Sequence, residues 1–72
     1  MTHRWRKTID GAYSKLARRG RRFYDLRILR VEDVGNRVKW GEWDADKRAF
    51  EAWTFAKNVA AAKRAAKDAG YE

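Results

Sequence analysis

The chain has 72 residues, no cysteine, no proline and a formal net charge of +8 at pH 7. This length predicts one small domain over residues 1–72, and the absence of cysteine excludes disulfides and thiolate metal sites as sources of stability. Because 44% of the residues are hydrophobic and ten are aromatic, the composition favours a folded domain over a disordered chain.

The positive charge is concentrated in the first 30 residues. This part of the chain holds ten basic residues against two acidic ones, whereas residues 31–72 hold eight of each. Eight of the ten basic residues are arginine, whose planar guanidinium can pair with a phosphate group through two hydrogen bonds. The asymmetry predicts a polyanionic partner that approaches from one side.

The N-terminal part is predicted to be a basic arm followed by a helix. Residues 1–7 form the arm, which could also be an edge strand. Over residues 8–19 the apolar side chains recur at helical spacing, and this pattern predicts a short helix that Thr8 caps and Gly20 ends. The alternative is a strand that forms a hairpin with the next segment through the arginine-rich stretch around Gly20.

Three strands are predicted for the middle of the chain. In residues 22–31, apolar Tyr24, Leu26 and Ile28 alternate with Asp25 and Arg27, which is typical of a strand with one buried face. Turn-forming residues at 32–36 and 44–48 separate this strand from two others, over 37–43 and 49–53. Short connections between consecutive strands predict an antiparallel meander over residues 22–55.

A C-terminal helix is predicted over residues 55–69. Its apolar stripe is mostly alanine, Thr54 is a suitable N-cap, and Gly70 is suited to the position after its end. The stripe consists of Phe55, Val59, Ala62, Ala66 and Ala69. The predicted fold class is therefore α+β: a small three-stranded antiparallel sheet packed by a C-terminal helix and preceded by a short N-terminal helix, in the order α-β-β-β-α.

This order of elements resembles that of the double-stranded RNA-binding domain, in which the second helix begins with lysines, as KNVAAAKRAA does here. A three-stranded sheet with one helix is also similar to the DNA-binding domains of plant AP2 factors and phage integrase arms. The second resemblance implies that the sheet reads the major groove through Arg37, Lys39, Trp40 and Trp43. Both resemblances concern layout alone, and both imply nucleic-acid binding.

Residues suited to catalysis or metal binding are sparse. His3 is the single histidine and Ser14 the single serine, and no sequence feature orients them for nucleophilic catalysis. The acidic residues of 42–47 begin like a calcium loop, but Lys47 takes the place of the required glycine and Trp53 that of the final glutamate. The sequence therefore predicts a protein that is not an enzyme and has no metal or cofactor.

Large aromatic rings are predicted on both faces of the sheet. Strict alternation places Trp40 on one face and Trp43 on the other, and it separates Phe50 from Trp53 and Phe55. One helix covers one face. The second face is therefore covered by the N-terminal helix or by a second copy of the chain, or its rings are exposed beside arginines for base stacking or partner burial.

The expected function is binding of nucleic acid, DNA more than RNA, through phosphate contacts with little sequence specificity. The candidate binding residues are Arg4, Trp5, Arg6, Lys7, Lys15, Arg18, Arg19, Arg21, Arg22, Arg27, Arg37 and Lys39. The alternative is a small protein-interaction module, such as a phage-encoded inhibitor, that binds an acidic protein surface. No signal peptide or membrane span is apparent, so we expect a cytoplasmic protein, either a monomer or a homodimer.

Overall fold

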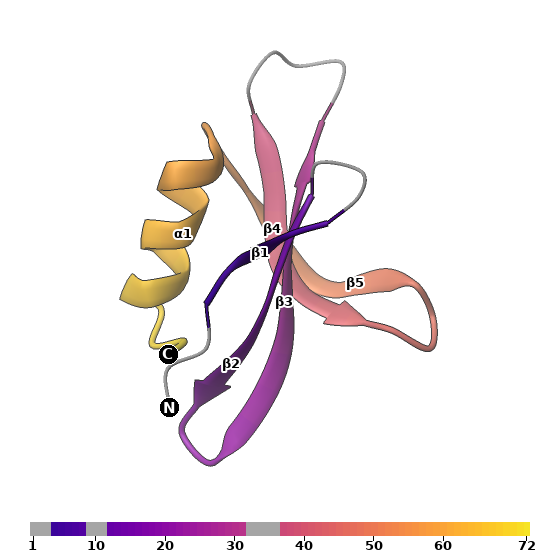
Figure 1. Cartoon of the computed structure of the whole chain (residues 1–72), viewed down its shortest axis with the longest axis vertical. Helices are drawn as coiled ribbons and strands as arrows, with labels where there is room; N and C mark the ends of the chain where they lie inside the picture. Colours follow the sequence, from indigo (N-terminus) through magenta and orange to yellow (C-terminus); the bar gives the residue numbers. More distant parts are fainter. Residues whose placement is uncertain (1–3, 9–11, 32–36) are drawn as a thin grey trace.

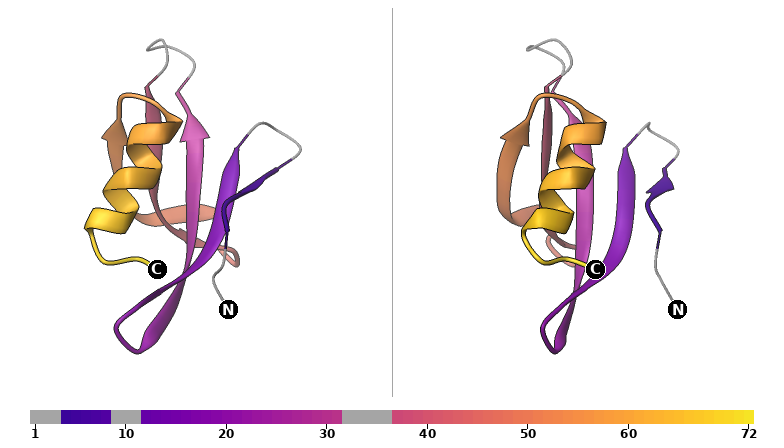
Figure 2. Two further views of the ribbon diagram at one scale, coloured as in Figure 1. Left: turned by 60° about the vertical axis from the view of Figure 1, so that its left-hand side comes forward. Right: turned by 90° about the vertical axis from the view of Figure 1, so that its left-hand side faces the viewer.

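The computed structural model describes residues 4–8, 12–31 and 37–72 of the chain. Its elements are β1 (Arg6–Lys7), β2 (Tyr13–Arg19), β3 (Arg22–Arg30), β4 (Val38–Asp44), β5 (Ala49–Ala56) and α1 (Val59–Asp68). The strands form one antiparallel sheet in chain order, and α1 lies against one of its faces (Figure 1). The helix contacts β4 and β5 and leaves β1 and β2 beside it (Figure 2).

The predicted N-terminal helix is wrong, and the sheet has five strands in place of three. Tyr13–Arg19 is strand β2, which pairs with β3 in a continuous register from Tyr13↔Ile28 to Arg19↔Arg22. The apolar residues that suit a helical stripe also suit a strand. In the strand, Ala17 is completely buried against the core. Part of the predicted helix, residues 9–11, lies outside the described residues.

The turn between β2 and β3 favours the hairpin over the helix. It has two central residues, and the first of them, Gly20, has a φ of 65°. Glycine with positive φ at this position is typical of a type II′ turn, whose twist matches that of paired antiparallel strands. Gly20 therefore connects two strands. The alternative prediction for this region, a hairpin, is confirmed.

The basic arm also contributes to the sheet. Arg6 and Lys7 form the short strand β1, which pairs with Ser14 and Tyr13 of β2. The edge-strand alternative for this region is thus confirmed for the two residues of β1, while residues 1–3 lie outside the described residues. No helix among the described residues is long and apolar enough to cross a membrane.

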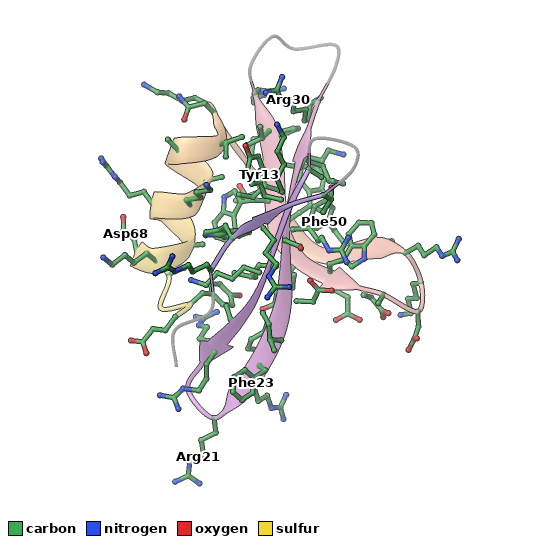
Figure 3. The ribbon with its side chains drawn as sticks, viewed as in Figure 1. Tyr13, Arg21, Phe23, Arg30, Phe50 and Asp68 are labelled. Atoms are coloured by element: carbon green, nitrogen blue, oxygen red, sulfur yellow. The ribbon has the colours of Figure 1, made fainter. Side chains whose placement is uncertain are left out.

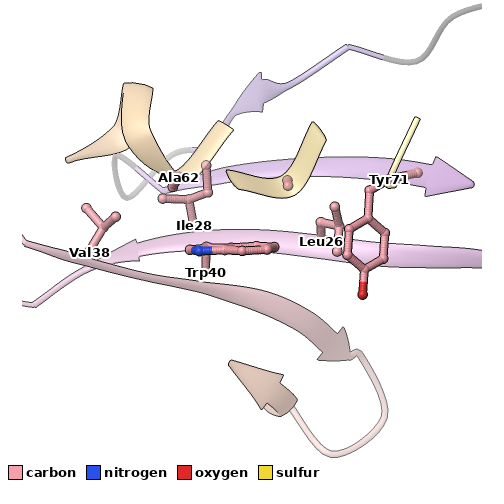
Figure 4. Close-up of a cluster of buried hydrophobic side chains, with 8 residues drawn as sticks. Leu26, Ile28, Val38, Trp40, Ala62 and Tyr71 are labelled. Atoms are coloured by element: carbon pink, nitrogen blue, oxygen red, sulfur yellow. The ribbon is translucent and has the colours of Figure 1, made fainter. Parts of the chain in front are cut away.

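The core lies between α1 and the face of the sheet beneath it, which we call the inner face (Figure 4). The alternation predicted for β3 is confirmed, because Leu26 and Ile28 are buried there. Ala62 and Ala66 of α1 are also buried, which confirms these two residues of the predicted stripe and lets the helix approach Trp40 closely, whereas Ala69 is exposed at the C-cap. The cluster consists of Ala17, Leu26, Ile28, Val38, Trp40, Ala62, Ala66 and Tyr71.

The helix begins later than the sequence predicts. Strand β5 continues to Ala56, so Phe55 pairs with Lys39 in the sheet and does not belong to the helix stripe. Asn58, rather than Thr54, is the N-cap, and its side-chain oxygen accepts a hydrogen bond of 2.8 Å from the backbone N–H of Ala61. This cap satisfies one of the N–H groups that a helix start leaves without an intrahelical partner.

The helix ends at Asp68 with Ala69 as its C-cap, and Gly70 follows it with a φ of 95°, in the role predicted for it. The N–H of Gly70 bonds the carbonyl of Lys67, and the N–H of Tyr71 bonds that of Ala66, which together form a Schellman motif. The reversal returns Tyr71 to the core, where its hydroxyl donates a 2.5 Å hydrogen bond to Glu42. Burial, followed by this hydrogen bond, raises the pKa of Tyr71 above its ordinary value.

A bulge in β5, opposite Glu42 and Trp43 of β4, changes which rings share a face. Glu42 pairs with Ala52, but the next residue, Trp43, pairs with Phe50, so Glu51 is the extra residue of β5. The prediction that Phe50 lies apart from Trp53 is therefore wrong. The extra residue reverses the alternation of β5 at this point, and local sequence spacing does not show it.

Gly41 allows β4 and β5 to approach each other closely beside the bulge. A Cβ atom at Gly41 would collide with the carbonyl oxygen of Ala52 and would lie 2.7 Å from the Cα of Trp53. Both obstacles are backbone atoms, which cannot move aside as a flexible side chain would. Glycine is thus required where the β4–β5 hairpin turns away from α1 (Figure 1).

The turn between β4 and β5 was predicted and is confirmed. The side chain of Asp44 accepts hydrogen bonds from the backbone N–H groups of Asp46, at 2.9 Å, and Lys47, at 3.1 Å. The bond from Lys47 is the main cause that lowers the pKa of Asp44. The other predicted turn, at 32–36, lies outside the described residues.

We predict that Gly41→Ala destabilises the protein by about 3 kcal/mol, because the added methyl group requires the β5 backbone to move. Gly20→Ala is the matched control. It introduces strain at positive φ but meets no atom within 4 Å, so its expected cost is about 1 kcal/mol. Urea unfolding followed by tryptophan fluorescence measures both. A cost for Gly41→Ala equal to or below that of Gly20→Ala would show that β4 and β5 are not this close.

Candidate nucleic-acid interface

The face of the sheet away from α1, which we call the outer face, carries a group of large aromatic side chains. Cross-strand partners lie on the same face of a sheet, so the register assigns these residues together. Phe50, for example, lies on the side of the sheet opposite to α1 (Figure 3). The aromatic residues of the outer face are Phe23, Trp43, Phe50, Trp53 and Phe55.

The outer face is exposed. The exposed fractions are 58% for Phe23, 46% for Trp53, 41% for Phe55 and 49% for the neighbouring Leu16. The one helix of the described residues packs on the inner face. The predicted covering by an N-terminal helix is therefore wrong, and these rings are accessible to a partner.

Four of the five outer-face rings are held in two edge-to-face pairs. Trp43 and Phe50 have ring centroids 5.2 Å apart, and Trp53 and Phe55 have centroids 5.0 Å apart. Such pairs are worth about 0.5–1.5 kcal/mol beyond the burial of their area. They fix the orientation of the rings before any partner binds.

Each of three outer-face rings has a cation beside it. Arg27 lies over Trp43, with its guanidinium carbon 5.2 Å from the ring centroid, and Lys39 lies over Trp53, with its Nζ at 4.2 Å. Arg37 and Phe55 form the closest of these contacts, at 4.0 Å. The attraction of a cation to the face of a ring holds the positive charge against the sheet. The outer face is thus both aromatic and cationic.

Within the described residues, most of this charge has no salt-bridge partner. The ion pair between Arg27 and Asp25, at 3.3 Å, is the single salt bridge in the described part of the chain. Arg37 has a buried Nε atom with no hydrogen-bond partner among the described residues. A buried donor without an acceptor is costly, so an anionic oxygen that reached Arg37 would gain a charge-assisted bond.

The arginine cluster of the β2–β3 turn lies at one end of the outer face. Arg18 pairs with Phe23 and so belongs to the outer face, and Arg21 projects from the tip of the hairpin (Figure 3). Arg19 points to the inner side, where its Nη1 donates a 3.5 Å hydrogen bond to the Tyr71 hydroxyl. Arg22 is exposed beside the turn. Because Arg22 pairs with Arg19, it belongs to the inner side, and the hairpin brings two of the four arginines, Arg18 and Arg21, to the end of the outer face.

The structure separates other candidate residues from this group. Trp5 is half-buried against the core, and Lys15 is on the inner face, with its Nζ 6.0 Å from the Trp5 ring centroid. Arg4 and Lys7 are exposed next to Trp5. The predicted arm in which Trp5 stacks a base is thus not part of the outer face. Arg6 belongs to it by its pairing with Ser14.

The reading strand implied by the AP2 resemblance is corrected as well. Trp40 is 8% exposed and belongs to the core, whereas Arg37, Lys39 and Trp43 lie on the outer face. The candidate binding residues chosen from the sequence contained none of the outer-face rings, and Trp43 was named only through the resemblance. The alternation that sets Trp53 and Phe55 on one face was visible, but the bulge that adds Phe50 was not.

An acidic cleft of about 350 Å³ borders the site between the two hairpins. Four carboxylate residues and two outer-face rings line it, so the cleft repels phosphate and limits the site on this side. The lining is Phe23, Tyr24, Asp25, Glu42, Trp43, Asp44, Ala45 and Glu51. No group of three His, Cys, Asp or Glu side chains suited to a metal ion occurs among the residues that the structure describes.

The chain matches no protein-family model, no curated protein and no solved structure. Its function must therefore be inferred from the chemistry of the outer face, which is aromatic, cationic and open.

We predict that the outer-face rings contribute little to stability. Trp53→Ala removes a ring that is 46% exposed and is expected to cost about 1 kcal/mol. Leu26→Ala removes a fully buried side chain and is expected to cost about 3 kcal/mol. Thermal unfolding followed by far-ultraviolet circular dichroism compares them. Similar losses in the two variants would mean that the outer face is packed in solution.

Proposed function

We propose that the protein binds nucleic acid and holds a single strand across the outer face. The observation that carries this proposal is the set of three cations, each positioned on an aromatic ring, on one open face of the sheet. A single strand presents unpaired bases for stacking and phosphates for ionic contact. The outer face offers a surface for each.

The exposed rings are suited to base stacking. Trp53 and Phe55 are partly exposed and are fixed by their mutual contact, so little side-chain entropy remains to be lost when a base stacks on them. Stacking on an aromatic side chain is worth about 1–3 kcal/mol per base, and every base can take part. This favours binding of unpaired bases with low sequence specificity.

The cations are suited to phosphate contact along a line. Arg18 and Arg21 lie at the hairpin end, and Arg37 and Lys39 lie toward the other end of the outer face. The stretch of β3 from Phe23 to Leu29 connects these two ends, and at the usual rise of a strand it is about 20 Å long. A strand of several nucleotides therefore contacts both groups while its bases lie over the rings.

Sequence readout is expected to be weak. Specific base contacts use bidentate side chains, most often Arg on guanine and Asn or Gln on adenine. The chain contains no glutamine and two asparagines, of which Asn58 is occupied as the helix cap and Asn36 lies outside the described residues. The preference for DNA over RNA and the cytoplasmic location are parts of the proposal, which describes a binding protein without catalytic activity.

A second candidate function is binding to an acidic protein surface. It is supported by Leu16 and Phe23, which are 49% and 58% exposed and lie beside Arg18 on the outer face. Apolar anchors next to arginine are common at protein interfaces. Nucleic acid is the better-supported partner because the cation-bearing rings extend over the rest of the outer face.

We predict that labelled dT15 binds more tightly than a duplex of the same length, because duplex bases cannot stack on the rings. Trp53→Ala is expected to weaken the dT15 affinity about tenfold. If about six phosphates are contacted, the plot of log affinity against log salt has a slope of about −4 for a single strand. Fluorescence anisotropy at two salt concentrations measures these quantities, and an RNA of the same length tests the preference for DNA.

The matched charge variants are Arg37→Gln on the outer face and Arg64→Gln on the exposed side of α1. Both remove one positive charge, so a non-specific effect of net charge weakens dT15 binding equally in the two. The proposal requires a larger loss for Arg37→Gln. Absence of binding at low salt, or equal losses in both variants, would reject the outer face as a nucleic-acid site.

A further inference from the structure

A groove of about 500 Å³ lies on the inner side of the sheet, away from the outer face. Residues of β2, β3, α1 and the C-terminal segment line it, and Figure 2 shows how α1 and β2 lie beside each other. Its volume is in the range of pockets that hold small molecules. The groove is lined by Trp5, Lys15, Leu26, Lys63, Ala66, Lys67, Tyr71 and Glu72.

The interior of the groove is apolar and aromatic. Leu26 and Ala66 are buried core residues that reach it from the sheet and the helix. Two aromatic side chains, the half-buried Trp5 and the buried Tyr71, also line it. Such a lining suits a flat apolar body more than a sugar or an extended polar chain.

Three lysines supply positive charge at the groove. Lys63 and Lys67 are four residues apart on α1 and therefore lie on the same side of the helix, and Lys15 comes from β2. None of the three takes part in a salt bridge within the described ranges. Lys15 is near the Trp5 ring, and the Nζ of Lys63 lies 4.7 Å from the Tyr13 ring centroid. Against these charges the lining has one acidic residue, Glu72.

The groove is bounded along β2 at both ends. Strand β1 pairs with β2 at Tyr13 and Ser14, and Glu72 exchanges two backbone hydrogen bonds with Arg18, at 2.8 and 2.9 Å. The segment of β2 between these contacts, residues 15–17, spans about 10 Å at the usual strand rise. A small ligand fits this segment, and a continuous polymer strand does not.

We propose that this groove is a binding site for a small aromatic anion. The flat body of the ligand lies against Trp5, Tyr71 and Leu26, and its carboxylate, sulfonate or phosphate group faces the three lysines. The site is on the opposite side of the sheet from the proposed nucleic-acid interface, so the two are occupied independently.

The probe is naphthalene-2-sulfonate, which combines a flat ring system with one anionic group. Two controls separate its parts: 2-naphthalenemethanol has the ring system without the charge, and methanesulfonate has the charge without the rings. Titrations of the whole chain are followed by ¹H–¹⁵N NMR. We expect saturable shifts of the Trp5 indole and of the Lys67 and Glu72 amides with the sulfonate, and binding at least about fivefold weaker with either control.

The double variant Lys63→Gln/Lys67→Gln tests the contribution of the lysines. Its affinity for naphthalene-2-sulfonate is expected to fall about fivefold, because two ionic contacts are lost. The matched control is Lys57→Gln/Arg64→Gln, which removes two charges outside the groove and should leave the affinity unchanged. Equal effects in both double variants, equal binding of the uncharged control, or shifts confined to the Trp53 indole would overturn the proposal.

The same variants distinguish this site from the proposed function. The groove variant should bind dT15 like its matched control, because its two lysines are not on the outer face. A loss of dT15 binding in the groove variant alone would show that the nucleic acid itself occupies the groove, and this also contradicts the small-anion site.

Discussion

The pairing of β2 with β3 determines which faces of the sheet the rest of the chain can cover. The two strands pair over seven residues through the Gly20 turn, and this commits Tyr13–Arg19 to the sheet. Among the described residues, α1 is then the one helix available to cover a five-stranded sheet. A ten-residue helix packs one face only. The core forms there, and the outer face retains aromatic rings that a covered sheet would bury.

The same hairpin decides where the positive charge lies. The arginines around Gly20 are held near the tip of this hairpin, and the register places Arg18 and Arg27 on the outer face with Lys39 of β4. Carboxylates collect instead at the cleft between the hairpins, where Asp44 and Glu51 lie. With one salt bridge among the described residues, the basic surface is largely free to attract an external anion.

Features with a local cause could be predicted from the sequence. The alternation of β3, the alanine stripe of α1 and the positive φ of Gly70 each depend on residues close together in the chain. The predicted N-terminal helix was wrong because the apolar residues around Ala17 fit both the helical and the strand period, and pairing with β3 across the Gly20 turn decided between them. The face predicted for Phe50 was wrong because the pairing of β4 with β5 contains a bulge, which the sequence spacing of β5 alone does not show. In the candidate site, the basic residues of the outer face had been named from composition, whereas its rings are assigned by strand register and the bulge.

The four tryptophan indoles provide the most direct test of an open outer face that binds a single strand. Trp43 and Trp53 lie on that face, Trp40 in the core and Trp5 in the groove. When dT15 is titrated into the ¹⁵N-labelled protein, the account predicts that the indole N–H resonances of Trp43 and Trp53 shift with a common affinity while that of Trp40 stays in place. Shifts of Trp5 or Trp40 without Trp43 and Trp53, or no shift at all at low salt, would contradict it.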